Sequence, residues 1–168
     1  TDVPQLRGAL FQSSIHPWPD HIYYQLANGK DADISLAWLK IANVGWFVYS
    51  GPREMYRDFK VPAAKFDEVL EFVEEKSGDR YYRVPLVNTS LAKAVPLGIS
   101  KLEKPKNAID KEPIFAYVEN LEASGSVLKL KSLKNGQYQI SGDLQSGELI
   151  LVQMAYAAGW HARDGRGK

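Results

Sequence analysis

The chain holds 168 residues, of which 45% are hydrophobic and 24% charged, with a formal net charge of +1 and no cysteine. This length is sufficient for one domain with an ordinary core, and the composition excludes a disordered or low-complexity chain. The balanced charge provides no general field for nucleic acid or anionic lipid, and the lack of cysteine excludes disulfides and thiolate chemistry. We therefore expect a globular protein without a nucleic-acid partner.

The first fifty residues predict two short helices followed by a strand. Trp18-Pro19-Asp20 suits a first helical turn, and Asn28-Gly29 ends that helix. Asp31 or Asp33 can cap the second helix. Its apolar residues recur at helical spacing: Ile34, Ala37, Trp38 and Ile41. The uninterrupted apolar run Trp46–Tyr49 predicts a strand that is buried on both faces.

The middle of the chain predicts one longer helix, two short strands and a linker. Pro62–Lys76 places apolar residues on one helical face and most of its Asp and Glu residues on the other. Arg80–Val84 and Lys93–Ile99 are strand candidates, and a proline in or after each of them suits a sheet edge. Lys101–Pro113 is charged, holds two prolines and shows no apolar periodicity, which predicts a linker.

Beyond residue 113 the apolar residues alternate, as they do in strands. The strand-like runs are Ile114–Glu119, Ser126–Leu133, Gln137–Ser141 and Glu148–Tyr156. Lys134-Asn135-Gly136 predicts a hairpin, because Asn-Gly accepts the positive φ angles of a type I′ turn. The sequence thus predicts an α+β fold. We expect a helix-rich α/β part at residues 1–100, a linker at 101–113 and an antiparallel sheet or sandwich-like part at 114–168, which can still pack as one domain.

The residue types that carry catalysis or bind metals do not fall at recognisable spacings. The histidines are His16, His21 and His161. They lack the spacing of metal ligands, and the chain has no Gly-x-Ser-x-Gly, phosphate-loop or dinucleotide-binding motif. Paired carboxylates lie on the outward face of the predicted helix: Glu68 with Glu71, and Glu74 with Glu75. A charged helix face of this kind is ordinarily a solvated one, so we predict no catalytic residue, no metal and no cofactor.

Aromatic residues are the one compositional indication of a ligand. The chain has four Trp, nine Tyr and six Phe, and core packing explains most of them. Trp160 borders a turn and Tyr156 ends a predicted strand, so both are candidates for exposed rings. We therefore predict that Trp160 and Tyr156 are able to stack on a sugar ring.

Two segments together resemble one family of membrane proteins. Leu39–Val48 resembles a helix-to-strand junction in the extracytoplasmic region of YfhO-like polytopic proteins, with Gly45-Trp46 in place of the usual Lys-Tyr. Leu149–Gly165 resembles the last strands of that region, with Ala158 in place of a proline. Some members of this family carry a label related to 6-pyruvoyl-tetrahydropterin synthase. Three scattered histidines do not supply the zinc cluster of such an enzyme, so we expect no pterin synthesis.

The resemblance implies a non-catalytic, soluble extracytoplasmic domain of a multispanning membrane protein. Proteins of this type resemble glycosyltransferases that use polyprenyl-linked sugars, and their catalytic carboxylate lies in a membrane loop outside this chain. The chain starts at Thr1 and stops just after Asp164-Gly165, so we expect it to be part of a longer protein. Expected partners are the transmembrane part, a glycan or lipid-linked sugar, and a second copy at the unpaired edge of the strand ending near Ala162.

Two other functions remain open at this point. One is a carbohydrate-binding β-sandwich module that holds its sugar without a membrane partner. It would need an exposed aromatic platform at Trp160 and Tyr156. The other is an enzyme in its own right, which would need a concave pocket of polar residues that the spacing of this chain does not suggest.

Overall fold

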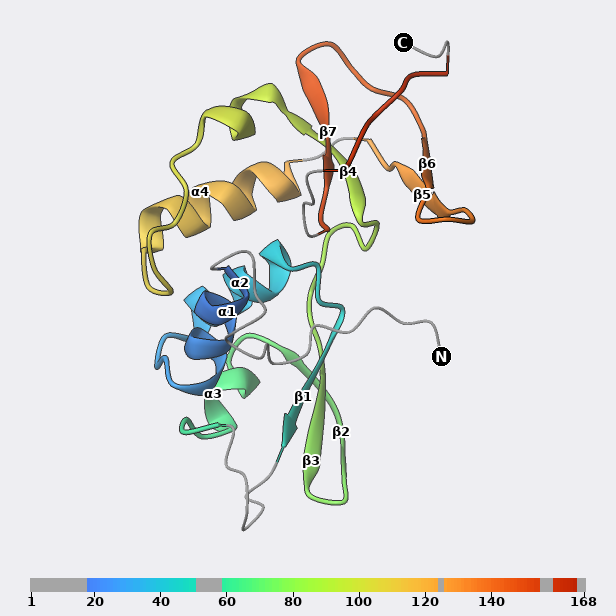
Figure 1. Ribbon diagram of the computed structural model, residues 1–168. Helices are drawn as coiled ribbons and strands as arrows, with labels where there is room; N and C mark the ends of the chain where they lie inside the picture. Colours follow the sequence, from blue (N-terminus) through green and yellow to red (C-terminus); the bar gives the residue numbers. More distant parts are fainter. Residues whose placement is uncertain (1–17, 51–58, 124–125, 155–158, 166–168) are drawn as a thin grey trace.

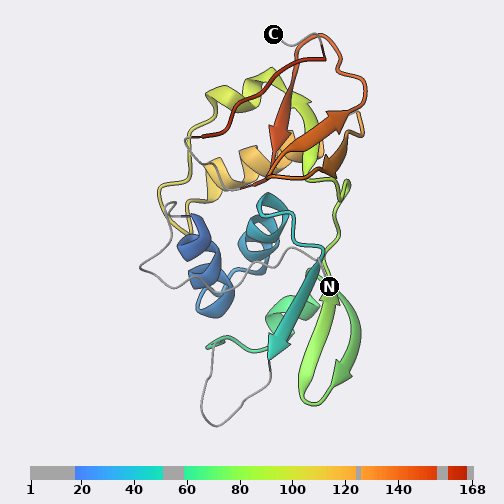
Figure 2. The same ribbon diagram turned by 45° about the vertical axis from the view of Figure 1, so that its right-hand side comes forward.

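The computed structural model describes residues 18–50, 59–123, 126–154 and 159–165, and these form an α+β fold (Figure 1). The elements in chain order are α1 (Trp18–Ala27), α2 (Ala32–Ile41), β1 (Trp46–Ser50), α3 (Ala64–Asp67), β2 (Glu71–Lys76), β3 (Asp79–Arg83), β4 (Ala92–Pro96), the 3-10 helix η1 (Leu97–Lys101), α4 (Lys111–Glu122), β5 (Lys129–Ser132), β6 (Tyr138–Ser141) and β7 (Glu148–Val152). One sheet lies at one end of the molecule, the remaining strands lie at the other, and α1, α2 and α4 lie beside and between them (Figure 2).

The two N-terminal helices form as the sequence predicts. The Asp31 carboxylate accepts a hydrogen bond from the Ile34 amide at 3.0 Å and so caps the start of α2. The four predicted stripe residues of α2 are all buried. Among them Trp38 is completely buried, and its indole Nε1–H donates to the Ala108 carbonyl at 2.9 Å. This contact joins α2 to the segment that precedes α4.

The first sheet is antiparallel with the strand order β1-β3-β2. Phe47 and Tyr82 lie opposite each other and are buried, whereas Trp46 and Val48 are exposed. The prediction that β1 is buried on both faces is therefore wrong, since one face of the strand meets solvent. The strand predicted at Arg80–Val84 is expected at a sheet edge. This position is also wrong, because the corresponding strand β3 lies between β1 and β2.

The helix predicted over Pro62–Lys76 is wrong for most of its length. Only α3 is helical there, and β2 follows as an exposed strand. The turn after β2 explains the difference, because Ser77 and Gly78 both have positive φ angles, 56° and 83°. Such a turn reverses the chain into β3, and the pairing of β2 with β3 outweighs the helical spacing of the residues. The glutamates expected on a helix thus lie along an edge strand.

The expected strand at Ile114–Glu119 is also wrong, because these residues belong to helix α4. Ile114, Val118 and Leu121 are buried at the spacing of one helical face. They share one core with α1, α2, the first sheet and β4. Ile114 and Val118 are four positions apart, which places them on one face of a strand as well as of a helix, and packing against α2 decides between the two. The predicted division of the chain at residues 101–113 stays a prediction.

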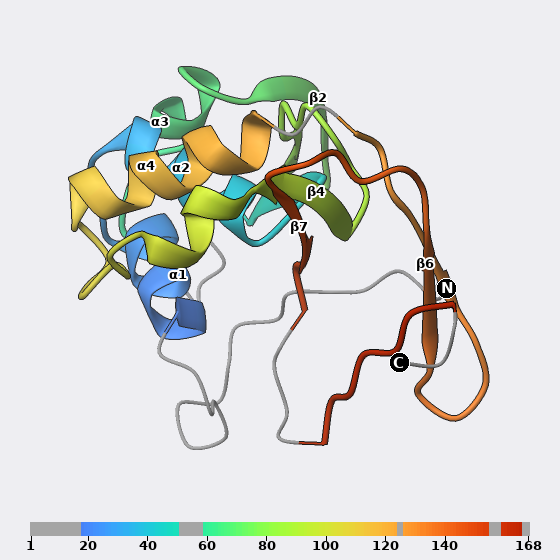
Figure 3. The same ribbon diagram turned by 90° about the horizontal axis from the view of Figure 1, so that it is seen from above.

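The remaining strands are antiparallel, as expected. β4 pairs with β7, and β5 pairs with β6 around a turn in which Asn135 and Gly136 have φ angles of 60° and 70°. This confirms the predicted type I′ hairpin. The hairpin packs on β4 through a small apolar cluster of Ala92, Ala94 and Leu128, with Leu130 and Ile140 partly buried against it. Seen from above, it stands apart from the helices, with β4 and β7 between (Figure 3).

Candidate functional site

Trp160 and Tyr138 form an aromatic pair on the surface, which is the candidate site. Their ring centroids lie 5.6 Å apart with an interplanar angle of 15°, so the two rings are stacked. Trp160 is 41% exposed and Tyr138 is 37% exposed. Tyr156, the other residue predicted from the sequence, lies outside the described residues. The structure thus gives Trp160 a partner that sequence reasoning did not identify.

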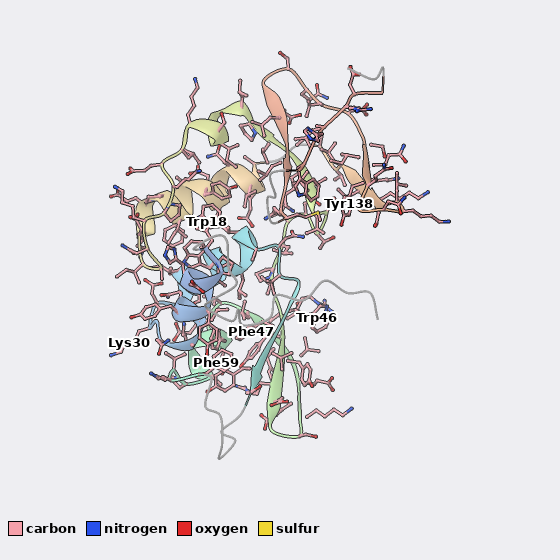
Figure 4. All side chains as sticks on the ribbon, in the orientation of Figure 1. Trp18, Lys30, Trp46, Phe47, Phe59 and Tyr138 are labelled. Carbon is pink, nitrogen blue, oxygen red and sulfur yellow. The ribbon has the colours of Figure 1, made fainter. Side chains whose placement is uncertain are left out.

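The hairpin determines where Tyr138 lies. Side chains alternate along a strand, so Tyr138 shares a face with Ile140, which packs on the small cluster beside β4. Tyr138 is the first residue of β6, and its cross-strand neighbour is the small Ser132. Because Ser132 covers little of the Tyr138 ring, Trp160 can approach it. Tyr138 lies well away from the core residues Trp18, Phe47 and Phe59 (Figure 4).

The chemistry available at this pair is stacking and hydrogen bonding to hydroxyl groups. Lys134 is exposed in the hairpin turn, and the hairpin between residues 129 and 141 contains three lysines and no acidic residue. Aromatic faces present a flat apolar surface that suits the C–H face of a sugar ring. No group of this pair is placed to transfer a proton or to attack a substrate. The pair is an exposed apolar surface.

A second polar cluster lies where α2, α4 and β4 meet. The Lys40 ammonium and the Glu122 carboxylate form an ion pair of 2.6 Å. The Lys93 ammonium, in a residue that is 4% exposed, donates to the side-chain oxygen of Asn43 at 3.1 Å and to the backbone carbonyl of Asn88. Burial lowers the pKa of Lys93, and the charge of Glu122 opposes this shift. These contacts satisfy a buried cation and join three elements.

The hollow beside this cluster is too small for a substrate. Its lining includes Lys40, Lys93 and Glu122, and its volume is about 10 Å³, which suits about one water molecule. Gln153 ties the segment after β7 to α2, because its Nε2 donates to the carbonyls of Lys40 at 3.1 Å and Ile41 at 2.7 Å. This last contact caps the end of α2 from the strand side. We therefore interpret the cluster as a structural tie.

A buried lysine near α1 also has a structural role. The Lys65 ammonium donates to the carbonyls of Gln25 at 2.8 Å and Gly29 at 2.6 Å, at the C-terminal end of α1. Burial lowers the pKa of Lys65 to about 8, and the nearby charge of Asp31 partly opposes this shift. A neutral amine would still have two N–H groups for the two carbonyls. Lys65 is only 6% exposed, so its amine is not accessible to a substrate.

Three carboxylates on α3 and β2 lie beside arginines of β3. Asp67 accepts from the Arg80 guanidinium at 2.9 Å and from the Tyr82 hydroxyl at 2.8 Å. Burial raises the pKa of the Tyr82 hydroxyl, and its hydrogen bond to Asp67 adds to the shift. Glu71 lies 3.7 Å from Arg83, and Glu75 lies 3.6 Å from Arg80. Two carboxylates that flank a substrate bond are not found in this group.

The two described histidines, His21 and His161, do not belong to a group of metal ligands. His21 packs beside Trp38 with ring centroids 6.1 Å apart, His161 is exposed near Trp160, and His16 lies outside the described residues. Within the described ranges, no three His, Cys, Asp or Glu side chains are close enough to hold a metal ion. In the same ranges, no helix combines the length and the apolar character that crossing a bilayer requires.

Comparison with family models, curated proteins and solved structures gives no match to this chain. The family resemblance of the two segments therefore stays a prediction.

Proposed function

We propose that this chain is a non-catalytic extracytoplasmic domain of a multispanning, glycosyltransferase-like membrane protein, and that it helps to place a glycan or its acceptor. The observation that carries the proposal is the stacked pair of Tyr138 and Trp160, in which each ring is more than one third exposed. Two stacked rings form a larger continuous apolar surface than a single exposed ring, and Tyr and Trp are enriched at binding surfaces. A ligand that stacks on this pair would cover apolar area that the fold leaves open.

The polar groups elsewhere support a role without catalysis. Lys65, Lys93 and Asp67 each have at least two hydrogen bonds to other parts of the chain. A general acid, base or nucleophile needs a free face toward a substrate, and these groups use their polar atoms to hold elements together. Binding and positioning are therefore better supported than bond cleavage.

The location and the membrane partner rest on the resemblance of Leu39–Val48 and Leu149–Gly165 to the YfhO-like family. On this proposal the transmembrane part of the same protein carries the catalytic carboxylate. The glycan or lipid-linked sugar reaches that part while it is held at the aromatic pair. An impermeant amine label applied to intact cells that produce the full-length protein should then modify exposed lysines of this domain. Labelling only after lysis would place the domain inside the cell and contradict the proposed location.

A second candidate function is a carbohydrate-binding module that acts without the membrane part. The same aromatic pair favours it, because an exposed stacked platform is the feature that such a module needs. The two candidates differ in what the chain does alone. A module binds a simple saccharide by itself, whereas an accessory domain binds its sugar mainly together with the transmembrane part.

The experiment is an NMR titration of the chain with simple sugars and polyprenyl-phosphate head-group analogues. Trp160→Ala tests the site. Trp46→Ala is the matched control, since Trp46 is 55% exposed at the start of β1 in the first sheet, away from Tyr138 (Figure 4). We expect saturable shifts that Trp160→Ala abolishes and Trp46→Ala preserves. Binding that survives Trp160→Ala would exclude this site, and no binding at millimolar ligand by the folded chain would exclude the module.

A further inference from the structure

Among the described residues, strand β1 has one edge without a partner strand, and the directions of its backbone hydrogen-bonding groups can be assigned. The Val84 amide donates to the Gly45 carbonyl at 3.0 Å, so Gly45 and Val84 form a hydrogen-bonded pair at the start of the strand. Bonded and non-bonded pairs alternate along an antiparallel ladder. The backbone groups of Phe47 and Tyr49 therefore face β3. Those of Trp46, Val48 and Ser50 point away from it.

The outward-pointing groups have no partner strand in the described ranges. Within these ranges β1 pairs with β3 alone, and none of the other backbone hydrogen bonds involves Trp46, Val48 or Ser50. The side chains next to this edge are open to solvent, because Trp46 is 55% exposed and Val48 is 41% exposed. Unpaired N–H and C=O groups on an accessible strand are a template for a further strand.

The two edges of this sheet differ in their protection. The opposite edge, β2, carries Glu71, Glu74 and Glu75 and has an irregular register between Phe72 and Glu74. Charged side chains and bulges are the usual devices that prevent an edge from pairing with another chain. Strand β1 has the sequence Trp-Phe-Val-Tyr-Ser, which contains no charge, no proline and mainly residues that favour strands. Strand β2 thus carries features that prevent pairing with another chain, and strand β1 carries none of them.

We propose that β1 pairs antiparallel with β1 of a second copy of this chain, about a two-fold axis at Val48. In this register Val48 lies opposite Val48 of the other copy, and Trp46 lies opposite Ser50. The outward-pointing groups of three residues on each strand would form about six backbone hydrogen bonds. No charged side chain meets a like charge, whereas the same pairing of β2 would bring glutamates close together. The product is one continuous sheet of six strands.

The side chains on both faces of β1 fit this pairing. On the inner face, Phe47 of one copy would lie opposite Tyr49 of the other, and aromatic cross-strand pairs stabilise a sheet. On the outer face, Trp46 already packs against the Arg83 guanidinium, whose centre lies 5.3 Å from the ring centroid. Trp, Tyr and Arg are the residue types that contribute most to protein interfaces. The second copy extends this outer face without burying an unpaired charge.

Sedimentation equilibrium over a range of concentrations tests the proposal. We expect a species of twice the 18.8 kDa chain mass at high concentration. Val48→Lys places two ammonium groups opposite each other and should leave only monomer. Ile150→Lys is the matched control, because Ile150 is 45% exposed on β7, outside the proposed interface. A strict monomer at all concentrations overturns the proposal. So does a dimer that Ile150→Lys abolishes and Val48→Lys preserves, which would place pairing at β7.

Hydrogen exchange of the unmodified chain provides a test that needs no variant. In a monomer, the amides of Phe47 and Tyr49 should be protected by β3, and those of Trp46, Val48 and Ser50 should exchange quickly. At concentrations that favour the dimer, all five should be protected. Protection of Val48 that does not change with concentration would show that this chain covers its own edge, which overturns the proposal.

Discussion

The two ends of the molecule have cores of very different size. At the end with the first sheet, Phe66 is completely buried and lies within 4.6 Å, centroid to centroid, of Phe47 and 6.3 Å of Tyr82. At the end with the β5–β6 hairpin, the buried cluster consists of Ala92, Ala94 and Leu128. A large aromatic core fixes the first sheet to the helices. The hairpin is held by a few contacts between small apolar side chains. The large rings at this end, Tyr138 and Trp160, lie on the surface.

This difference indicates which parts of the chain serve stability and which are available for binding. Aromatic rings inside the first end stabilise the fold because they remove large apolar areas from water. The rings of Tyr138 and Trp160 contribute less, since each retains more than a third of its exposure. Regions with few buried contacts open more readily than the global fold. We therefore expect the hairpin end to be the less stable of the two.

The largest effect should come from Phe66→Ala. This change removes a completely buried ring that packs against several aromatic neighbours, so the free energy of unfolding should fall by about 3–5 kcal/mol. Urea unfolding followed by circular dichroism measures it. Val73→Ala, at an exposed position of β2 outside the proposed dimer interface, is the control and should change stability much less. A loss below about 1 kcal/mol for Phe66→Ala would contradict the assigned core.

Leu128→Ala tests the small core at the end with the β5–β6 hairpin. Leu128 is 2% exposed and packs on Ala92 and Ala94, so removing its side chain should destabilise by about 2–3 kcal/mol. Hydrogen exchange should show the loss mainly in the amides of β5 and β6, while those of β3 stay protected. Equal loss of protection in β3 would mean that both ends unfold as one unit and do not differ in stability.

Tyr82→Phe tests the hydrogen bond between Tyr82 and Asp67 at the end with the first sheet. The change removes the hydroxyl that donates to Asp67 at 2.8 Å and leaves the ring in place. We expect a loss of about 1 kcal/mol in the free energy of unfolding, because Arg80 still satisfies the Asp67 carboxylate. The neighbouring Tyr81→Phe is the control. If both variants lose the same amount, the Asp67 hydrogen bond has no particular role.

Lys65 predicts a smaller effect that depends on pH. Burial lowers the pKa of Lys65 to about 8 in the folded chain, whereas the ordinary lysine pKa of 10.5 applies when the chain is unfolded. Between these values the unfolded state binds more protons, so this residue makes the free energy of unfolding rise with pH across that window. Lys65→Met should remove this rise, and the exposed Lys30→Met should not. Unfolding at several pH values measures the slope, and an unchanged slope in Lys65→Met would contradict the low pKa.

Part of the candidate site could be predicted from the sequence. Trp160 precedes a turn-forming Asp164-Gly165, and this context indicated a ring near the surface. Tyr138 was not predicted as its partner, because 22 positions separate the two residues and no local pattern joins them. The pair forms only when the hairpin packs on β4 and carries Tyr138 beyond the small cluster. Tertiary packing alone supplies that placement.

The sequence by itself determined the elements that local chemistry can stabilise. The Asp31 cap of α2 and the Asn135-Gly136 turn depend on residues that are adjacent along the chain. The sequence by itself also indicated the α+β class, through the change from helical to alternating apolar spacing. These features are independent of the rest of the fold, because a cap or a tight turn satisfies its own backbone groups.

Only the tertiary structure decided the identity of the segments Pro62–Lys76 and Ile114–Glu119. Each contains apolar residues at spacings that suit more than one kind of element. Pairing with β3 makes a strand of the end of the first segment, and packing on α2 makes a helix of the second. The physical reason is that intrinsic propensities amount to tenths of a kcal/mol per residue, roughly, whereas the burial of one large side chain contributes about 1.5–3 kcal/mol.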